Sequence, residues 1–244
     1  MKGKKSAYLA ASVLFVIVET VLGYSLQVET GRKIALFSFA SIVVACFFCL
    51  VFFSRTKQYL FTQLAMVCTL IADYLLIICT PPIKPPAMVV FLGAQLLYFF
   101  RLYDAEPSLT RKKVQCGIHG ALCVAVLIAT VIVLKKNCDL LAVVSMLYYV
   151  TLIVNAGVAF SRFKKHSILA IGLLLFILCD TMIGMSMLEG YFSIPTDSVI
   201  YKIIHPGFDL AWACYLPSQM LIVLSLLPDA LKRCSKTERG ENDA

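Results

Sequence analysis

Two aspartates lie inside apolar segments that are long enough to cross a lipid bilayer. Asp73 is part of FTQLAMVCTLIADYLLIIC, and Asp180 is part of ILAIGLLLFILCDTMIGMSML. An ionised side chain near the centre of a bilayer costs roughly 2.5–3.5 kcal/mol on insertion scales. Ionisable residues inside spans commonly mark functional sites, so these two carboxyl groups are the first candidates for chemistry.

Two neighbouring carboxyl groups in a low-dielectric site do not ionise alike, so one can stay protonated while the other is charged. This pairing supplies a general acid and a general base for hydrolysis. The sequence has no G-x-S-x-G nucleophile motif and no H-E-x-x-H motif, and it holds only three histidines. We therefore predict no metal site and no cofactor, and assign Asp73 and Asp180 as the catalytic pair.

The elements that carry these acids are predicted to be membrane helices. Hydrophobic residues make up 60% of the chain, charged residues only 15%, and the mean hydropathy is +0.87. No segment alternates as a barrel strand would, and a spanning helix needs about 20 apolar residues. The predicted fold is all-α, an integral membrane bundle of eight helices at 7–27, 34–53, 59–79, 86–103, 114–134, 139–160, 167–189 and 207–227.

Basic residues predict the orientation of this bundle. With a cytoplasmic N-terminus, the outer side holds only Arg32, Lys33, Lys84, Lys135, Lys136 and Lys202, and the other sixteen of the 22 basic residues face the cytoplasm. This asymmetry and the even number of spans predict that both termini are cytoplasmic. The same asymmetry accounts for the net charge of +8, so we predict no nucleic-acid partner.

The predicted organisation is one transmembrane domain over residues 1–228, followed by a polar cytoplasmic tail over 229–244 that we expect to be disordered. The two halves of the bundle resemble each other weakly. The third and seventh spans each carry an aspartate about 14 residues from the cytoplasmic end, and the next spans carry Gln95 and Gln219. A parallel duplication and chance both explain this match.

Other polar residues are predicted to share a layer with the two aspartates. Glu19 lies about 13 residues into the first span, and Gln95 lies about nine residues below the outer end of the fourth. Tyr98 follows Gln95 by three residues, and Tyr215 precedes Gln219 by four, which are helical spacings. Such residues either bind a polar ligand group or join helices by hydrogen bonds.

Four ordered segments resemble the YhhN-type lysoplasmalogenases. These segments are TLIADYLLI, FLGAQLLYFF, GLLLFILCDTMIGMSML and YLPSQMLIVLS. They follow the family's patterns G-D-x-x-L, H-x-x-Y, F-x-x-S-D and Y-x-x-A-Q in the third, fourth, seventh and eighth spans. The resemblance implies an eight-span membrane enzyme that hydrolyses the vinyl-ether bond of lysoplasmalogens to a fatty aldehyde and a glycerophospho-base.

By the same resemblance, Asp73 and Asp180 match the family's acidic residues, and Tyr98, Tyr215 and Gln219 match their polar companions. Lys33, which opens the second span, matches a basic residue found there in relatives. We predict that these three companions, together with Gln95, Glu19 and Lys33, bind the substrate, a lysophospholipid drawn from the bilayer.

The chain departs from the family's patterns at several positions. Ala72 replaces a glycine, Cys179 replaces a serine, and Gln95 stands where a histidine is usual. Because glutamine replaces this histidine, an alternative is that the protein is a catalytically inactive relative that only binds lipid. Paired acids in a two-half bundle also suit a proton-coupled transporter. The sequence leaves the oligomeric state open, and the short connections favour a bacterial cell membrane.

Overall fold

The computed structural model describes residues 2–28, 32–52, 56–187, 191, 195, 198–199, 201 and 209–238. Within these ranges the chain is helical and has no strand, as predicted. The elements run in the order α1 (Lys2–Val28), α2 (Arg32–Val51), α3 (Lys57–Asp73), η1 (Tyr74–Ile78), α4 (Lys84–Asp104), α5 (Leu109–Leu134), η2 (Lys135–Asn137), α6 (Leu140–Ser161), α7 (Phe163–Met187), α9 (Leu210–Leu224) and α10 (Leu227–Glu238).

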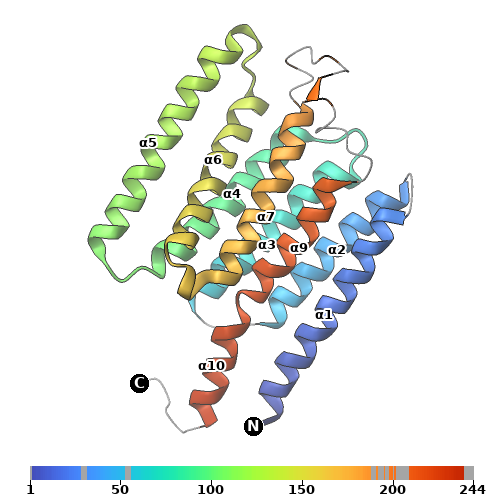
Figure 1. The fold of residues 1–244 in the computed structure, drawn as a ribbon, viewed down its shortest axis with the longest axis vertical. Helices are drawn as coiled ribbons and strands as arrows, with labels where there is room; N and C mark the ends of the chain where they lie inside the picture. Colours follow the sequence, from blue (N-terminus) through green and yellow to red (C-terminus); the bar gives the residue numbers. More distant parts are fainter. Residues whose placement is uncertain are drawn as a thin grey trace.

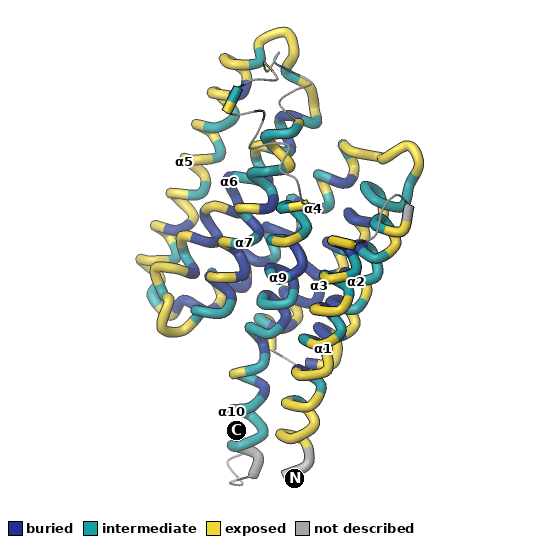
Figure 2. Tube along the Cα trace, turned by 45° about the vertical axis from the view of Figure 1, so that its right-hand side comes forward, coloured by how far each residue is buried: buried dark blue, intermediate teal, exposed yellow. Residues whose placement is uncertain are grey.

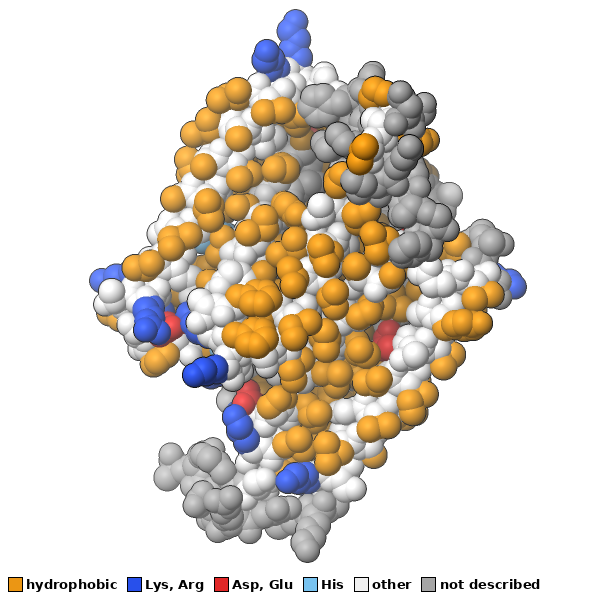
Figure 3. All heavy atoms as spheres, in the orientation of Figure 1, with side chains coloured by type: hydrophobic (Ala, Val, Ile, Leu, Met, Phe, Trp, Pro, Cys, Tyr) orange, Lys and Arg blue, Asp and Glu red, His pale blue; other side chains and the backbone are white. Residues whose placement is uncertain are grey.

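Eight helical stretches in the described part of the chain are long and apolar enough to cross a membrane, which confirms the predicted bundle. They run alternately up and down, so both termini lie at one end of the molecule (Figure 1). We call this the proximal end, and the opposite end, where α1, η1 and α7 finish, the distal end. Apolar side chains cover the visible face, while Lys and Arg gather toward its edges (Figure 3).

Helix starts follow local capping chemistry. The Asp139 carboxylate accepts a hydrogen bond from the Ala142 N–H at 2.7 Å, and Asp209 accepts one from the Trp212 N–H at 3.1 Å. Ser108 caps α5 in the same way by accepting from the Arg111 N–H. Each cap satisfies a donor that the first turn of a helix leaves unpaired.

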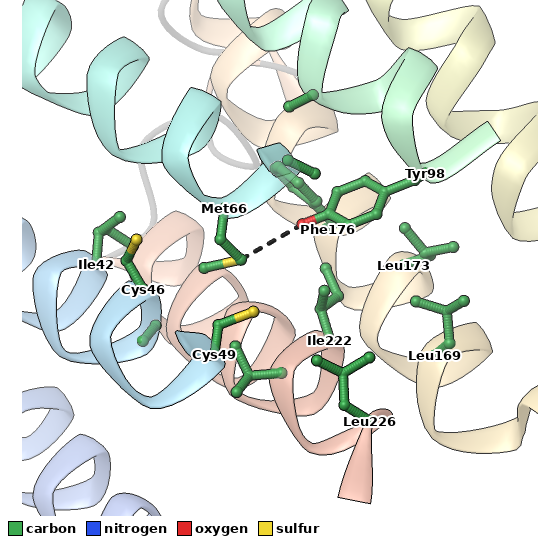
Figure 4. Packing of buried hydrophobic residues seen from close by; sticks show 14 of the residues in the cluster. Ile42, Cys46, Cys49, Met66, Tyr98, Leu169, Leu173, Phe176, Ile222 and Leu226 are labelled. Carbon is green, nitrogen blue, oxygen red and sulfur yellow. Dashed lines mark hydrogen bonds between the residues drawn. The ribbon is translucent and has the colours of Figure 1, made fainter. Parts of the chain in front are cut away.

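The buried centre of the bundle is formed mainly by α3, α4, α6, α7 and α9 (Figure 2). Helices α3 and α4 pack closely as one pair, and α7 and α9 as another. In the close-up, Tyr98 projects between Met66 of α3 and Leu173 and Phe176 of α7 (Figure 4). Helix α5 lies at the edge of the bundle against α6, and most of its surface is exposed (Figure 1).

Arg162 ties the proximal ends of three elements together. Its guanidinium donates to the Leu102 carbonyl at 2.9 Å and to the Gln115 side chain at 3.2 Å, and pairs with Glu106 at 2.8 Å. The Glu106 carboxylate also accepts from the Ser108 N–H at 3.0 Å. These contacts fix the short turn between α4 and α5.

Several predicted boundaries differ from the structure. Helices α1 and α5 begin at Lys2 and Leu109, before the predicted residues 7 and 114. The eighth span was predicted to end at residue 227, with a disordered tail from Asp229. Instead α9 ends at Leu224, and α10 continues to Glu238, so the expectation of disorder is wrong for residues 229–238. Disorder was predicted because the tail is polar. In the structure Leu226 and Ala230 are buried and hold this helix against the bundle.

The third span also differs from its prediction in its last turn. Helix α3 ends at Asp73, and residues 74–78 form a π-helix, whose wider turn a regular 3.6-residue pattern does not reveal.

Candidate active site

The two intramembrane aspartates each accept a hydrogen bond from a tyrosine. The Tyr215 hydroxyl donates to Asp73 Oδ2 at 2.6 Å, and the Tyr148 hydroxyl donates to Asp180 Oδ2. Hydrogen bonds to an ionised carboxylate are roughly twice as strong as those between neutral groups. The tyrosines therefore fix the position of both carboxyl groups.

Phe176 connects the two acid–tyrosine pairs. Its ring centroid lies 6.4 Å from that of Tyr148 and 5.4 Å from that of Tyr215, both in edge-on contacts. Because this one ring contacts both tyrosines, the two acid–tyrosine pairs lie in one region of the bundle.

The two aspartates differ in exposure. Asp73 is only 4% exposed, whereas Asp180 is half-buried. Asp73 is also the last residue of α3, immediately before the π-helix. Short π-helical turns often occur at functional sites because they redirect side chains.

A layer of unsatisfied polar atoms lies next to the carboxyl groups. Thr69 is one turn before Asp73 on α3, and Gln219 is one turn after Tyr215 on α9, which runs the opposite way. The Thr69 hydroxyl and Gln219 Oε1 are buried and have no hydrogen-bond partner within the described residues. Buried polar atoms normally have partners, so these two are suited to bind a polar ligand group.

Gln95 joins the same layer from α4. Asn155 Nδ2 donates to the Gln95 carbonyl at 2.8 Å and to its Oε1 at 3.2 Å, which ties α6 to α4. Gln95 is fully buried, and its Nε2 has no partner in the described part of the chain. The Asn155 side-chain oxygen is unsatisfied in the same way.

Glu19 lies on the other flank of the bundle. It is buried between α1 and α2, and the Ser41 hydroxyl donates to its Oε2 at 2.5 Å. Two contacts place this pair near the level of the aspartates: Phe39 lies against Tyr74, and a Cβ added at Gly23 would approach Leu216 at 3.4 Å. Among the described residues, no hydrogen bond joins Glu19 to either aspartate, and its Oε1 has no partner.

Two predicted substrate-binding residues lie apart from the carboxyl groups. The Tyr98 hydroxyl donates to the Met66 sulfur at 3.4 Å, about two turns of α3 before Asp73 (Figure 4). Lys33 is exposed in the first turn of α2 at the distal end. Their roles in binding stay predictions.

Sequence reasoning did not assign Tyr148 to the site. Its signal was present, because Tyr148, Thr151 and Asn155 follow helical spacing along one face of α6. The pairing of Tyr148 with Asp180 depends on how α6 packs on α7, which spacing within one helix does not determine.

No cluster of three or more His, Cys, Asp or Glu side chains that could hold a metal occurs among the residues the structure describes. The arrangement instead offers two fixed carboxyl groups beside unsatisfied amide and hydroxyl groups. Such a site can donate a proton, accept one and orient a polar substrate without a bound ion.

Comparison with protein-family models gives one match, to the YhhN family, over residues 33–226. The matched region includes both aspartates and both of the tyrosines that bind them. No curated protein and no solved structure matches the chain.

Proposed function

The chain belongs to the YhhN family, and from this membership and its acid pair we propose that it is a membrane hydrolase that cleaves the vinyl-ether bond of lysoplasmalogens. The observation that carries the proposal is the pair of tyrosine-bound carboxyl groups, Asp73 with Tyr215 and Asp180 with Tyr148.

In the proposed mechanism, one carboxylic acid protonates the vinyl carbon that is remote from the ether oxygen. This protonation leaves an oxocarbenium ion, which the other aspartate, ionised, stabilises electrostatically. The ionised carboxylate then takes a proton from water as the water oxygen attacks the cationic carbon.

The product of this addition is a hemiacetal. It collapses when its hydroxyl proton passes to the aspartate that first protonated the vinyl carbon, while the glyceryl oxygen takes up the proton that the other aspartate gained from water. The net change is one water consumed, with one fatty aldehyde and one glycerophospho-base released. Both aspartates return to their starting protonation states.

The buried amides and hydroxyls next to the acids would orient the glycerol and the water. Gln95, Gln219 and Thr69 supply donors and acceptors for this purpose. Asp180 is the more exposed acid, so the alkenyl chain would approach from its side of α7, where Ile183 and Met187, three and seven residues later, are exposed. The phosphate would point to the distal end, where Lys33 lies in the first turn of α2 and Lys84 begins α4.

Aldehyde release by purified protein in detergent tests this proposal. We expect wild-type protein to release aldehyde from a lysoplasmalogen, and the Asp73→Asn and Asp180→Asn proteins to release none above background. Asp139→Asn is the matched control, because Asp139 caps α6 outside the site. Full release by either site variant would refute the assignment.

The same assay separates the alternatives. A hydrolase turns over in micelles without any gradient, whereas a proton-coupled transporter gives flux only in sealed vesicles. Binding of a lysolipid without aldehyde release, in wild-type protein, would instead indicate an inactive lipid-binding relative.

A further inference from the structure

We propose that a basic pocket at the proximal end of the bundle binds a phosphate group, at a second site distinct from the aspartate pair. The pocket has a volume of about 390 Å³ and lies where α4, α7 and α10 meet. Its lining includes Arg101, Lys164, Lys165, His166, Asp229 and Lys232.

Arg101 is the central feature of this pocket. It is only 5% exposed, and its Nη1 has no hydrogen-bond partner within the described ranges. Its Nη2 makes one long bond, 3.5 Å, to the Ser225 carbonyl. A buried guanidinium with unused donors matches the geometry of a phosphate, which accepts paired N–H bonds.

A helix start faces the same pocket. His166 has non-helical backbone angles (φ −124°, ψ 28°), so α7 is broken there and its long segment restarts at Ser167. Ser167, Ile168 and Leu169 all line the pocket. The N-terminal end of a long helix carries partial positive charge, which favours a bound anion.

The surrounding charges are unbalanced. Four cationic side chains line the pocket, namely Arg101, Lys164, Lys165 and Lys232, against the one carboxylate of Asp229. Asp229 lies 4.0 Å from Lys232, and the two side chains are 50% and 78% exposed. One carboxylate does not balance four cations, so the pocket keeps an excess of positive charge. Lys165 donates to the Ala105 carbonyl at 3.4 Å.

Distance separates this pocket from the aspartate pair. Tyr98 touches Met66, seven residues before Asp73, and Arg101 is three residues beyond Tyr98. Ten residues of helix span about 15 Å. The six single bonds between a vinyl-ether carbon and the phosphorus of a lysolipid reach less than about 9 Å, at roughly 1.5 Å each. A substrate bound at the aspartates therefore cannot fill this pocket with its own phosphate.

Two sources could supply the phosphate: a lipid headgroup of the adjacent leaflet, or a free phosphate in the aqueous phase. Binding of inorganic phosphate would be measured by the thermal stability of the detergent-purified protein, with chloride at equal ionic strength as the reference. Lipid binding would be measured by the same unfolding assay in phosphatidylcholine nanodiscs with and without added phosphatidate.

We expect added phosphate or phosphatidate to raise the unfolding temperature of the wild-type protein. The Lys164→Gln/Lys232→Gln protein should bind about tenfold more weakly or worse, because it loses two charge-assisted contacts at exposed positions. Lys113→Gln, an exposed basic residue outside the pocket, is the matched control and should bind like wild type. Arg101→Met should abolish the response if the variant folds.

If inorganic phosphate raises the unfolding temperature, the free anion is sufficient to occupy the pocket. If only phosphatidate raises it, the ligand is a lipid headgroup. The proposal is overturned if neither probe stabilises the wild-type protein, or if the double lysine variant responds as fully as wild type. These binding measurements do not depend on aldehyde release, so they stand or fall separately from the proposed hydrolysis.

Discussion

At the scale of single residues, the tyrosine hydroxyls are the groups that hold the two acids in place. Each hydrogen bond to a charged group contributes about 1.5–3 kcal/mol, and both bonds here lie away from bulk water. Their removal should affect catalysis without removing either carboxyl group.

We expect Tyr215→Phe and Tyr148→Phe each to lower kcat/KM for aldehyde release by roughly 10- to 100-fold, the rate equivalent of one lost charge-assisted bond. Tyr149→Phe is the control, because that hydroxyl bonds Thr181 instead of an acid. Wild-type rates in both site variants would show that the tyrosines do not support the reaction.

Gln95 stands where the family resemblance implies a histidine. An imidazole in its place could share proton transfer, which is worth about 10²–10⁴-fold where it operates. We expect Gln95→His to raise kcat and to add the titration of an imidazole to the pH profile of the rate. A Gln95→Leu protein removes the amide without adding a base and should be slower than wild type.

At the scale of elements, close approach of α7 and α9 brings the acid-bearing helix against the tyrosine that holds Asp73. A Cβ added at Gly172 would lie 3.1 Å from the Ser218 carbonyl and 3.2 Å from Ile222. The glycine therefore permits a contact that a larger residue would force apart.

We expect Gly172→Leu to destabilise the protein by about 1–3 kcal/mol through overpacking, and to lower aldehyde release as well. Gly157→Leu on α6 has open space around it and should leave both quantities near wild type. Thermal unfolding in detergent and the aldehyde assay provide the two measurements. Equal stability of the two variants would contradict the tight α7–α9 contact.

The turn between α4 and α5 predicts a pH effect on stability. The Ser108 N–H, and then the Arg162 guanidinium, hold the pKa of Glu106 below its usual range. When the pKa of a carboxyl group is lower in the native state than in the unfolded state, its ionisation stabilises the protein. This stabilisation is present above the unfolded-state pKa of ~4.3 and is lost as the pH falls through the native-state pKa.

The stability difference between wild type and Glu106→Gln should therefore be full at neutral pH and shrink below about pH 4. Chemical unfolding across this range measures it. Gln115→Leu removes another partner of Arg162, but glutamine does not titrate. The stability difference between wild type and this variant should therefore not follow the titration of Glu106. A pH-independent difference for Glu106→Gln would show that its ionisation does not stabilise the turn.

At the scale of the whole molecule, the alternating helices put both termini at the proximal end, and the basic residues predict that this end is cytoplasmic. Reporter fusions test the orientation. A reporter active only in the cytoplasm should work after residue 238 and fail when inserted at residues 81–82. The reverse pattern would invert the predicted topology.

The sequence was sufficient for the architecture because lipid imposes a strong constraint on it. Each span needs about 20 apolar residues and a backbone whose N–H and C=O groups are all hydrogen-bonded within the helix. Eight apolar runs of this length in the sequence therefore predict eight helices. The helix that begins at Leu227 was not predictable in the same way, because its stability depends on the burial of Leu226 and Ala230 against the bundle.

The candidate site was predictable only in part. Asp73 and Asp180 stand out because charged groups are unfavourable in lipid, and their shared depth follows from the rise of a helix. The tyrosines that bind these aspartates could not be predicted from the sequence, because Tyr148 reaches Asp180 only through the packing of α6 on α7. The π-helix after Asp73 also shifts the face on which later residues lie, and a regular 3.6-residue period does not predict this shift.

The turn at residues 105–108 divides the chain into two pieces with four membrane-crossing helices each. Because four is even, each piece would begin and end on the same side of the bilayer and could insert without the other. Asp73 would then belong to one fragment and Tyr215 to the other. A chain severed at this turn would recover its activity only when the two fragments are made together, so turnover would report their reassembly in the membrane.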